Sequence, residues 1–233
     1  MKKHGKAYVE ASTLVDKNKT YSATEAISLL KSLKPKKFDE TVEVAIRVNI
    51  DTKKTDMNLR STIVLPNGTG KTKKVLVITK NHQSDAKTAG ADFIGAEDMI
   101  EKIEKESWFG FDSIVATPEM MPALGKIGKI LGPKGLMPNP KLGTVTTNVS
   151  QAVSNIKKGM IEFKNDTFGN VHGPIGKLSF GEKELLENLN AFVNEVSKNK
   201  PNGVKGIFIK SISISSTMSP SVRVDKNSFD KIQ

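Results

Sequence analysis

The stretch IFIKSISISSTMSPSVR, residues 207–223, decides how the end of the chain folds. Its side chains alternate with a period of two, which predicts a half-buried β-strand. The apolar set is Phe208, Ile212 and Ile214, and the opposite set consists of short hydroxyls, Ser211, Ser213, Ser215 and Thr217. A face without bulk lets another backbone approach and offers it hydrogen-bond donors and acceptors. Pro220 cannot donate within a ladder, so we expect the strand to end there and to present Met218 at a turn.

Segments with alternating apolar and polar residues also occur elsewhere near both ends of the chain, whereas the middle contains continuous apolar runs. Period-two alternation predicts strands at residues 42–50, 61–65, 160–164 and 171–175. Continuous apolar runs at 75–79 and 113–117 predict buried parallel strands, because helical segments separate them. Helices are expected at 22–34, 85–89, 96–106, 120–131, 148–157 and 182–196, the first opened by a capping box of Ser22 and Glu25.

The simplest architecture is therefore one domain inserted into another. Residues 1–67 and 159–233 would form a discontinuous domain, and residues 68–158 an inserted α/β domain. The basic start, Met1–Lys6, is expected to be a mobile arm. The excess of basic residues is larger in the discontinuous domain, which favours it as the main contact with a polyanion.

Composition narrows the classes of partner and of site. The 36 Lys and Arg residues against 25 Asp and Glu give a net charge of +11, which suits RNA, DNA or an anionic membrane surface. We find no apolar run long enough to span a membrane and no signal peptide, so a cytoplasmic protein is expected. The absence of cysteine excludes disulfides and thiolate metal sites, and three scattered histidines do not make a metal cluster. No cofactor is expected.

The segment Gly68-Thr69-Gly70-Lys71-Thr72 invites a phosphate-loop interpretation, because it comes after a strand. That motif needs a glycine where Leu65 stands and a helix afterwards, whereas the sequence predicts a strand from Val75. A hinge is the better interpretation. The expected hinge residues are Pro66, Asn67 and Gly68 where the chain enters the insert, and Lys158 and Gly159 where it returns.

A Gly/Pro-rich loop at residues 132–143 is the centre of a lysine group made of Lys126, Lys129, Lys134 and Lys141. Prolines reduce the entropy lost when a loop is ordered against a partner. The four ammonium groups could meet phosphates, or they could simply keep the surface soluble. The residues alone favour neither interpretation over the other.

Phe38 is a lone aromatic between Lys36-Lys37 and Asp39-Glu40. It could stack on an unpaired base while the two lysines contact phosphates. By itself, a buried core phenylalanine is the more common case. The hydroxyl strand, taken alone, is likewise more often a solvated sheet face than a binding surface.

Several longer motifs bear on these alternatives. They are Lys3-His4-Gly5-Lys6, residues 37–43 (KFDETVE), residues 130–141 (ILGPKGLMPNPK), residues 161–166 (IEFKND), residues 172–177 (HGPIGK) and Thr217-Met218-Ser219-Pro220-Ser221. In order and spacing the chain resembles, from end to end, the bacterial L-one family of large-subunit ribosomal proteins. Two departures stand out: Ser219 replaces a usual glycine, and Thr167-Phe168 replaces the usual Lys-Thr before Gly169.

The resemblance implies an α/β (α+β) fold of two domains. One is a discontinuous two-layer domain with a mainly antiparallel sheet, and the other is an inserted Rossmann-like three-layer domain. It also implies a non-enzymatic, structural role in the mobile rRNA stalk beside the tRNA exit site, with release of deacylated tRNA and repression of the protein's own mRNA. The implied rRNA-binding residues are Lys36, Lys37, Phe38, Thr41, His172, Lys177, Ser211, Thr217, Met218 and Ser219, with a neutral His172 bonding a phosphate or 2′-hydroxyl. The lysine group becomes a second RNA contact, such as with the exit-site tRNA.

Two competing interpretations belong to other classes. One is a nucleotide-dependent enzyme built on the insert, although the sequence brings no nucleophile, acidic pair or metal ligands together. The other is a general RNA chaperone, which would show little preference for stalk rRNA. A final conditional expectation concerns Ser219. If the usual glycine provides a positive φ, Ser219 is strained and Ser219→Gly is stabilising.

Overall fold

The computed structural model describes residues 5–33, 37–54, 57–204 and 206–229. Its chain divides into two compact units, residues 1–70 with 161–233, and residues 71–160. The boundaries expected from sequence lie a few residues earlier on both strands of the linker. The first connecting segment stays with the first unit because buried Asn188 binds it. Asn67 N donates to Asn188 Oδ1 at 3.0 Å, and Asn188 Nδ2 donates to Gly68 O at 3.0 Å.

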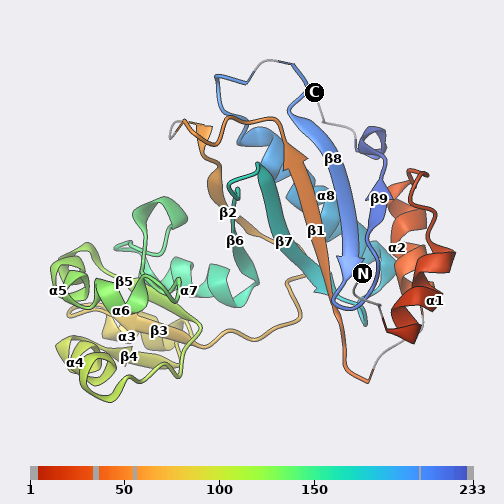
Figure 1. Cartoon of the computed structure of the whole chain (residues 1–233). Helices are drawn as coiled ribbons and strands as arrows, with labels where there is room; N and C mark the ends of the chain where they lie inside the picture. The colour runs from red at the N-terminus through yellow and green to blue at the C-terminus, as the bar shows by residue number, and fades with distance from the viewer. Residues whose placement is uncertain (1–4, 34–36, 55–56, 205, 230–233) are drawn as a thin grey trace. The chain divides into compact units, whose positions relative to one another are not determined.

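The first unit is built on a four-stranded antiparallel sheet in the order β7-β1-β8-β9 (Figure 1). The strands are β1 (Thr41–Val48), β7 (Asn170–Lys177), β8 (Ile209–Ser216) and β9 (Val222–Val224), and a separate pair is formed by β2 (Arg60–Val64) and β6 (Met160–Lys164). Its helices are α1 (Lys6–Leu14), α2 (Ala23–Ser32) and α8 (Glu182–Lys198), with a 3-10 turn at Lys226–Ser228. The strands predicted from the alternating segments are confirmed, and so is the mainly antiparallel sheet that the family resemblance implies.

The N-terminal part differs from expectation in one respect. The expected arm ends at Lys6, but Lys6 is the first residue of α1. The capping box of α2 is confirmed, since Glu25 N donates to Ser22 Oγ at 3.3 Å and Ser22 N donates to Glu25 Oε2 at 3.1 Å. Residues 1–4 lie outside the described part of the chain.

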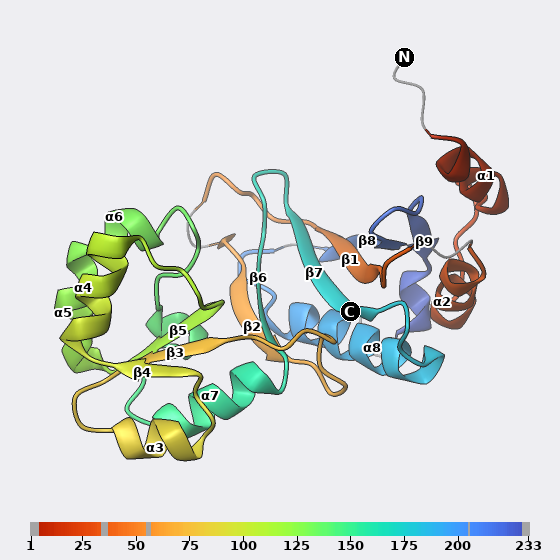
Figure 2. The same ribbon diagram turned by 90° about the horizontal axis from the view of Figure 1, so that it is seen from below.

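Only one face of the four-stranded sheet carries the apolar core. The inward residues of β1 alternate along the strand and pack against α2 and α8, which supply Ile27, Leu30, Leu189 and Phe192 (Figures 1 and 2). On the opposite face Glu43 and Arg47 are exposed. Both Phe208 and Ile209 are buried, because the pairing of β1 with β8 shifts register between Arg47 and Val48. Strict alternation from sequence does not reveal that bulge.

The second unit is a three-layer α/β domain. Its parallel sheet has the order β4-β3-β5, with β3 (Val75–Ile78), β4 (Phe93–Gly95) and β5 (Ser113–Ala116). Two apolar clusters lie on opposite sides of β3, one containing Leu76 and Ile78 and the other Val75 and Val77. The helices are α3 (Gln83–Thr88), α4 (Glu97–Glu106), α5 (Met121–Lys126), α6 (Gly128–Leu131) and α7 (Val149–Lys157), with 3-10 turns at Pro118–Met120 and Pro140–Leu142. Together the two units confirm the predicted α/β fold class.

The single helix expected at residues 120–131 is wrong. The segment is broken into a 3-10 turn, α5 and α6, and the break between the two helices is at Ile127, whose ψ is 9°. The flanking Gly125 and Gly128 weaken a continuous helix, because glycine loses more backbone entropy there than other residues do. In the described part of the chain, no helix has the length and apolar character needed to cross a membrane.

Candidate nucleic-acid interface

The open face of the antiparallel sheet carries short and basic side chains. At the middle of the sheet a cross-strand row runs from Arg223 to Ser213, then Ala45, then His172. Arg223 and His172 at the two ends of this row are exposed. Next along the sheet, Arg47 pairs with Ser211 on one side and with Asn170 on the other. The face therefore carries hydroxyls beside the cations of Arg47 and Arg223, as contact with a phosphate backbone requires.

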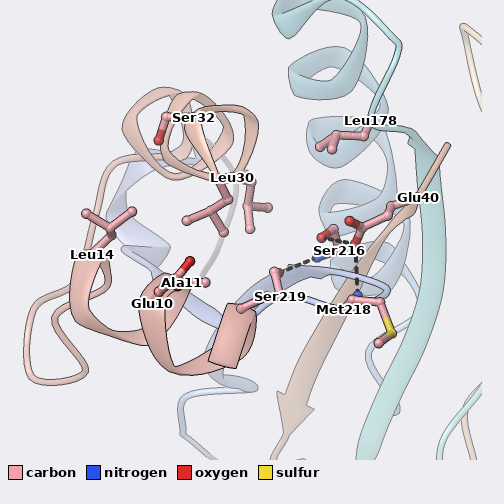
Figure 3. Close-up of a pocket in the computed structure, with 12 residues that line it drawn as sticks. Glu10, Ala11, Leu14, Leu30, Ser32, Glu40, Leu178, Ser216, Met218 and Ser219 are labelled. Carbon is pink, nitrogen blue, oxygen red and sulfur yellow. Dashed lines mark hydrogen bonds between the residues drawn. The ribbon is translucent and has the colours of Figure 1, made fainter. Parts of the chain in front are cut away.

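The turn after β8 lies at one end of this face and presents Met218, which is 55% exposed. Its main chain is held by Glu40, whose carboxylate Oε2 accepts hydrogen bonds from Ser216 Oγ at 2.6 Å and from Met218 N at 2.9 Å (Figure 3). Glu40 is only 3% exposed. A buried carboxylate with two donors fixes its neighbours strongly, because charge-assisted hydrogen bonds are short and directional. Met218 is thus displayed on a rigid turn.

Beneath this turn lies a cavity of about 220 Å³ that reaches to α1 (Figure 3). Leu30 and Leu178 line it together with Ala11 of α1. The helix α1 itself has no buried residue among those described. Glu40, Met218 and Ser219 also line this cavity, so it lies between α1 and the Met218 turn.

Thr217 and Lys177 join the turn to the start of β1. Thr41 N donates to Thr217 Oγ1 at 3.1 Å, and Lys177 Nζ donates to Thr41 Oγ1 at 3.1 Å and to Asp39 O at 3.1 Å. The structure therefore brings three predicted site residues, Thr41, Thr217 and Lys177, into one network. The Thr217 hydroxyl therefore stabilises the fold, independently of any contact with a partner.

Phe38 and Lys37 precede this network and are exposed. Phe38 is 53% exposed, so the alternative in which it belongs to the core is wrong. Lys36, the other predicted phosphate contact of this segment, lies outside the described residues. An exposed ring next to a lysine has the composition of a base-stacking site.

His172 lies on the open face, with Nε2 at 3.8 Å from Asp166 Oδ2. Asp166 has a pKa below its ordinary value, chiefly because Asn170 N donates to its carboxylate, with further bonds from the Asn170 side chain and Phe168 N. His172 is not part of the network around Thr41, which lies nearer the other end of β1.

Ser219 does not adopt the geometry that would favour glycine. Among the described residues, Ser107 is the non-glycine residue with a positive φ. Ser219 Oγ instead accepts from Ser216 N at 2.8 Å (Figure 3). It also donates to Pro220 O at 3.0 Å. The expectation of a strained Ser219 is wrong, because its side chain closes the turn.

The lysine group of the second unit is less uniform than a single loop. Lys126 lies in α5 and Lys129 in α6, whereas Lys134 lies in the turn after α6 and Lys141 in a 3-10 turn. All four are exposed. Lys134 Nζ lies 4.3 Å from the centre of the Phe109 ring, which fixes one of these cations by a cation–π contact.

The expected hinge residues Pro66–Gly68 lie shortly before the first unit ends at Gly70, and Lys158 and Gly159 lie shortly before the chain returns to it at Ile161. The geometry near Gly68 argues against a phosphate loop. Gly68 and Gly70 have φ of 66° and 70°, and a Cβ on Gly70 would lie 2.7 Å from Lys177 Cγ. The next element along the chain is the strand β3 and not a helix. The remaining expected hinge residues are Pro66, Asn67, Lys158 and Gly159, the last with φ of 98°.

Four residues on or beside the face escaped the sequence interpretation as site residues. Arg47 and Arg223 are exposed on it, Glu43 pairs with Ser215, and Glu40 supports the turn from below. Arg47 and Glu43 could have been found, because both fall on the outward phase of β1. Glu40 could not, since an acid next to a strand is normally solvated. No group of residues able to hold a metal ion occurs in the described ranges.

Comparison with known proteins identifies the family to which the chain belongs. The family model of the ribosomal protein L1p/L10e family matches residues 29–220. The large ribosomal subunit protein uL1 of Thermosipho africanus is 53% identical over 97% of this chain and 97% of its own length. The protein of the same name from Mesoplasma florum is 53% identical over 97% of this chain and all of its own length.

The chain belongs to the ribosomal protein L1 family. It is therefore a structural, rRNA-binding protein of the large subunit, in the cytoplasmic ribosome, and it is not an enzyme. The nucleotide-dependent enzyme considered from sequence is excluded by this membership. The resemblance inferred from the sequence motifs is confirmed.

Proposed function

We propose that the open face of the first unit and the Met218 turn bind the rRNA of the mobile stalk beside the tRNA exit site. The observation that carries this proposal is a sheet face left without apolar cover, ending at a turn that Glu40 holds rigid. A rigid site loses less entropy on binding than a mobile one. The contact residues are those predicted from the sequence, with Arg47 and Arg223 added.

Affinity and selectivity come from different parts of this surface. Lys37, Arg47 and Arg223 contact phosphates and release counterions, which supplies salt-dependent affinity. The serine hydroxyls of β8 and the exposed Glu43 carboxylate can bond 2′-hydroxyls, which distinguish RNA from DNA. Phe38 and Met218 contact unpaired bases, whose flat faces suit an aromatic ring or a polarizable thioether.

The lysine group of the second unit forms a second, weaker RNA contact. Four exposed lysines on two short helices and two turns match phosphates but offer no surface for reading bases. The exit-site tRNA is the proposed partner, and this contact aids the release of deacylated tRNA. Replacing all four lysines by alanine is expected to weaken tRNA binding and to leave stalk rRNA binding nearly unchanged.

The same rRNA-binding surface represses translation of the protein's own mRNA. A message that imitates the rRNA site would occupy the open face, so the two RNAs would compete. Competition between a stalk rRNA fragment and the leader of the mRNA tests this directly. Simultaneous binding of both RNAs contradicts it.

Footprinting the whole protein on full-length large-subunit rRNA tests the main proposal. Protection should concentrate on the stalk, and it should be lost together when Met218 and Phe38 are replaced by alanine. Protection spread over unrelated helices at physiological salt supports the general RNA chaperone instead.

A further inference from the structure

Phe168 is an exposed aromatic residue that the proposed site does not use. It lies in the turn between β6 and β7 and is 73% exposed, the largest value among the exposed large hydrophobic side chains of the described residues. An isolated exposed aliphatic residue needs no explanation, but a ring this open is unusual. The surrounding residues, Thr167 and Lys164, are polar and exposed, so no larger apolar patch includes the ring.

The turn that carries Phe168 is fixed from several sides. Asp166 Oδ1 accepts from Phe168 N at 2.8 Å and from Asn170 N at 2.7 Å, while Asp166 Oδ2 accepts from Asn170 Nδ2 at 2.9 Å. Thr52 Oγ1 donates to Thr167 O at 2.8 Å. Gly169 has φ of 78°, and a Cβ there would lie 3.1 Å from Val48 O. The ring is therefore held out by an ordered turn.

This turn adjoins the end of the open face that is opposite the Met218 turn. Val48 N, at the last residue of β1, donates to Gly169 O at 2.8 Å, whereas Thr217 is bonded to Thr41 at the first residue. An eight-residue strand is roughly 24 Å long from first to last residue. Phe38 precedes the first residue of β1 and Phe168 precedes the glycine bonded to its last residue, so the two rings flank opposite ends of one strand.

Basic side chains of the open face, of β6 and of a neighbouring loop lie next to the Phe168 turn. Arg47 Nη1 donates to Asn170 Oδ1 at 3.4 Å, so the guanidinium reaches the residue that closes the turn. Exposed Lys164 precedes the turn in β6, and exposed Lys53 comes directly after Thr52, which is bonded to it. The Asp166 carboxylate accepts from N–H donors within the turn, and exposed Asp51 precedes Thr52 as Lys53 follows it.

We infer that Phe168 is a second base-stacking platform, which holds an unpaired base of the RNA bound across the open face. The ring supplies the stacking surface, and Arg47 with the neighbouring lysines meets the flanking phosphates. An apolar protein partner would need a contiguous apolar patch, whereas one ring among cations matches one base in its backbone. This inference rests on the proposed function of the face, and it extends the RNA contact to both ends of β1.

The experiment measures the affinity of the whole protein for a stalk rRNA fragment with Phe168→Ala, Phe168→Leu and Phe168→Tyr. Loss of one stacked base predicts roughly five- to hundredfold weaker binding for the alanine variant. Phe168→Leu should lose nearly as much, because an aliphatic side chain cannot stack, and Phe168→Tyr should stay within about twofold of wild type. Val64→Ala, which trims an exposed apolar residue of β2, is the matched control and should bind as wild type.

Hydroxyl-radical footprints of the same complexes locate the base. The alanine variant should lose protection at one unpaired segment and keep the protection that depends on Met218. Unchanged affinity in Phe168→Ala, or equal affinities of the leucine and tyrosine variants, overturns the inference. A wild-type protein that does not prefer stalk rRNA at all is a different result, because it refutes the proposed function itself.

Discussion

The central strands of the two units bury their side chains in opposite ways. In β1 burial alternates from residue to residue, whereas all four residues of β3, Val75–Ile78, are fully buried. A strand covered on both faces keeps no side chain for a partner, so the second unit can bind only through its helices and turns. A strand covered on one face keeps a continuous row of side chains free. This difference makes the first unit the place for an extended RNA contact.

The largest expected effect comes from separating the two units. A chain of residues 1–70 joined to 161–233 by a short Gly/Ser linker should fold and keep most stalk rRNA affinity. The isolated segment 71–160 should bind the same RNA roughly a thousandfold more weakly, at the level of nonspecific binding. Circular dichroism checks folding, and filter binding measures both affinities. A folded first unit that binds no better than 71–160 contradicts the assignment of the RNA surface.

The next largest effect is expected from replacing Glu40, which lies on the buried side of the first unit's sheet, whereas Glu43 lies on the open side. Glu40→Ala leaves Ser216 Oγ and Met218 N without their acceptor and should lower the free energy of unfolding by about 3 kcal/mol. It should also weaken stalk rRNA binding, because the turn loses its anchor. Urea denaturation measures the first effect.

Glu43→Ala is the matched control, since it removes an exposed carboxylate from the other face of the same strand. It should change stability by less than about 0.5 kcal/mol. Equal destabilisation by the two variants contradicts the structural role of Glu40.

A third prediction separates selectivity from charge within the open face. Met218→Ala should weaken cognate rRNA binding roughly tenfold and leave binding to a scrambled RNA unchanged. Lys37→Ala should weaken both, and should change the slope of log affinity against log salt by roughly 0.7 to 0.9. A salt series with both RNAs measures this. Undiminished discrimination in Met218→Ala removes the turn from the recognition site.

Thr217 needs a different substitution in the same series. Its hydroxyl bonds Thr41, so Thr217→Ala mixes a fold effect with an RNA effect. Thr217→Ser keeps the hydroxyl and tests the RNA contact of the methyl group alone.

Ser219→Gly has a smaller expected effect, opposite in sign to the one anticipated from sequence. Glycine removes the acceptor that holds Ser216 N and adds backbone freedom, so stability should fall by about 1 kcal/mol. Thermal unfolding measures it, and Ser219→Ala isolates the hydrogen-bond part. A rise in stability with glycine contradicts the role given to Ser219 Oγ.

The sequence predicted the longer strands of both units, because period-two alternation and continuous apolar runs report directly on burial, but not the three-residue edge strands β4 and β9. It also placed the capping box of α2, where two side chains three residues apart determine a local structure. It missed the bulge at Ile209 and the break at Ile127, which depend on strand register and on local packing.

The candidate site was predictable only in part, because it too depends on contacts between residues that are distant in sequence. Thr41, Thr217 and Lys177 were expected together from a family resemblance, and their hydrogen bonds are long-range contacts that no local pattern encodes. The role of Glu40 depends on Ser216 and Met218, which are far away in sequence. Exposure of Phe38 and Phe168 was not predicted either, because a phenylalanine is more often buried even where its sequence neighbours are polar.

The smallest expected effect is the pH dependence contributed by Asp166. N–H donors of Asn170 and Phe168 stabilise its ionised form and keep the pKa of the carboxyl below its ordinary value of 3.8. A group with a lowered pKa in the folded state contributes stability that is complete above 3.8 and is lost as the pH falls through the folded-state pKa. Wild type should therefore exceed Asp166→Asn in stability at pH 7, and the difference should shrink between pH 4 and pH 2. Because the side chain is 36% exposed, water screens these bonds and the difference should be modest. Urea midpoints of both proteins across this range measure it, with Asn170→Ala removing one side-chain donor and reproducing part of the change. A difference that does not vary with pH means that the turn holds Phe168 by shape alone, without using the charge of Asp166.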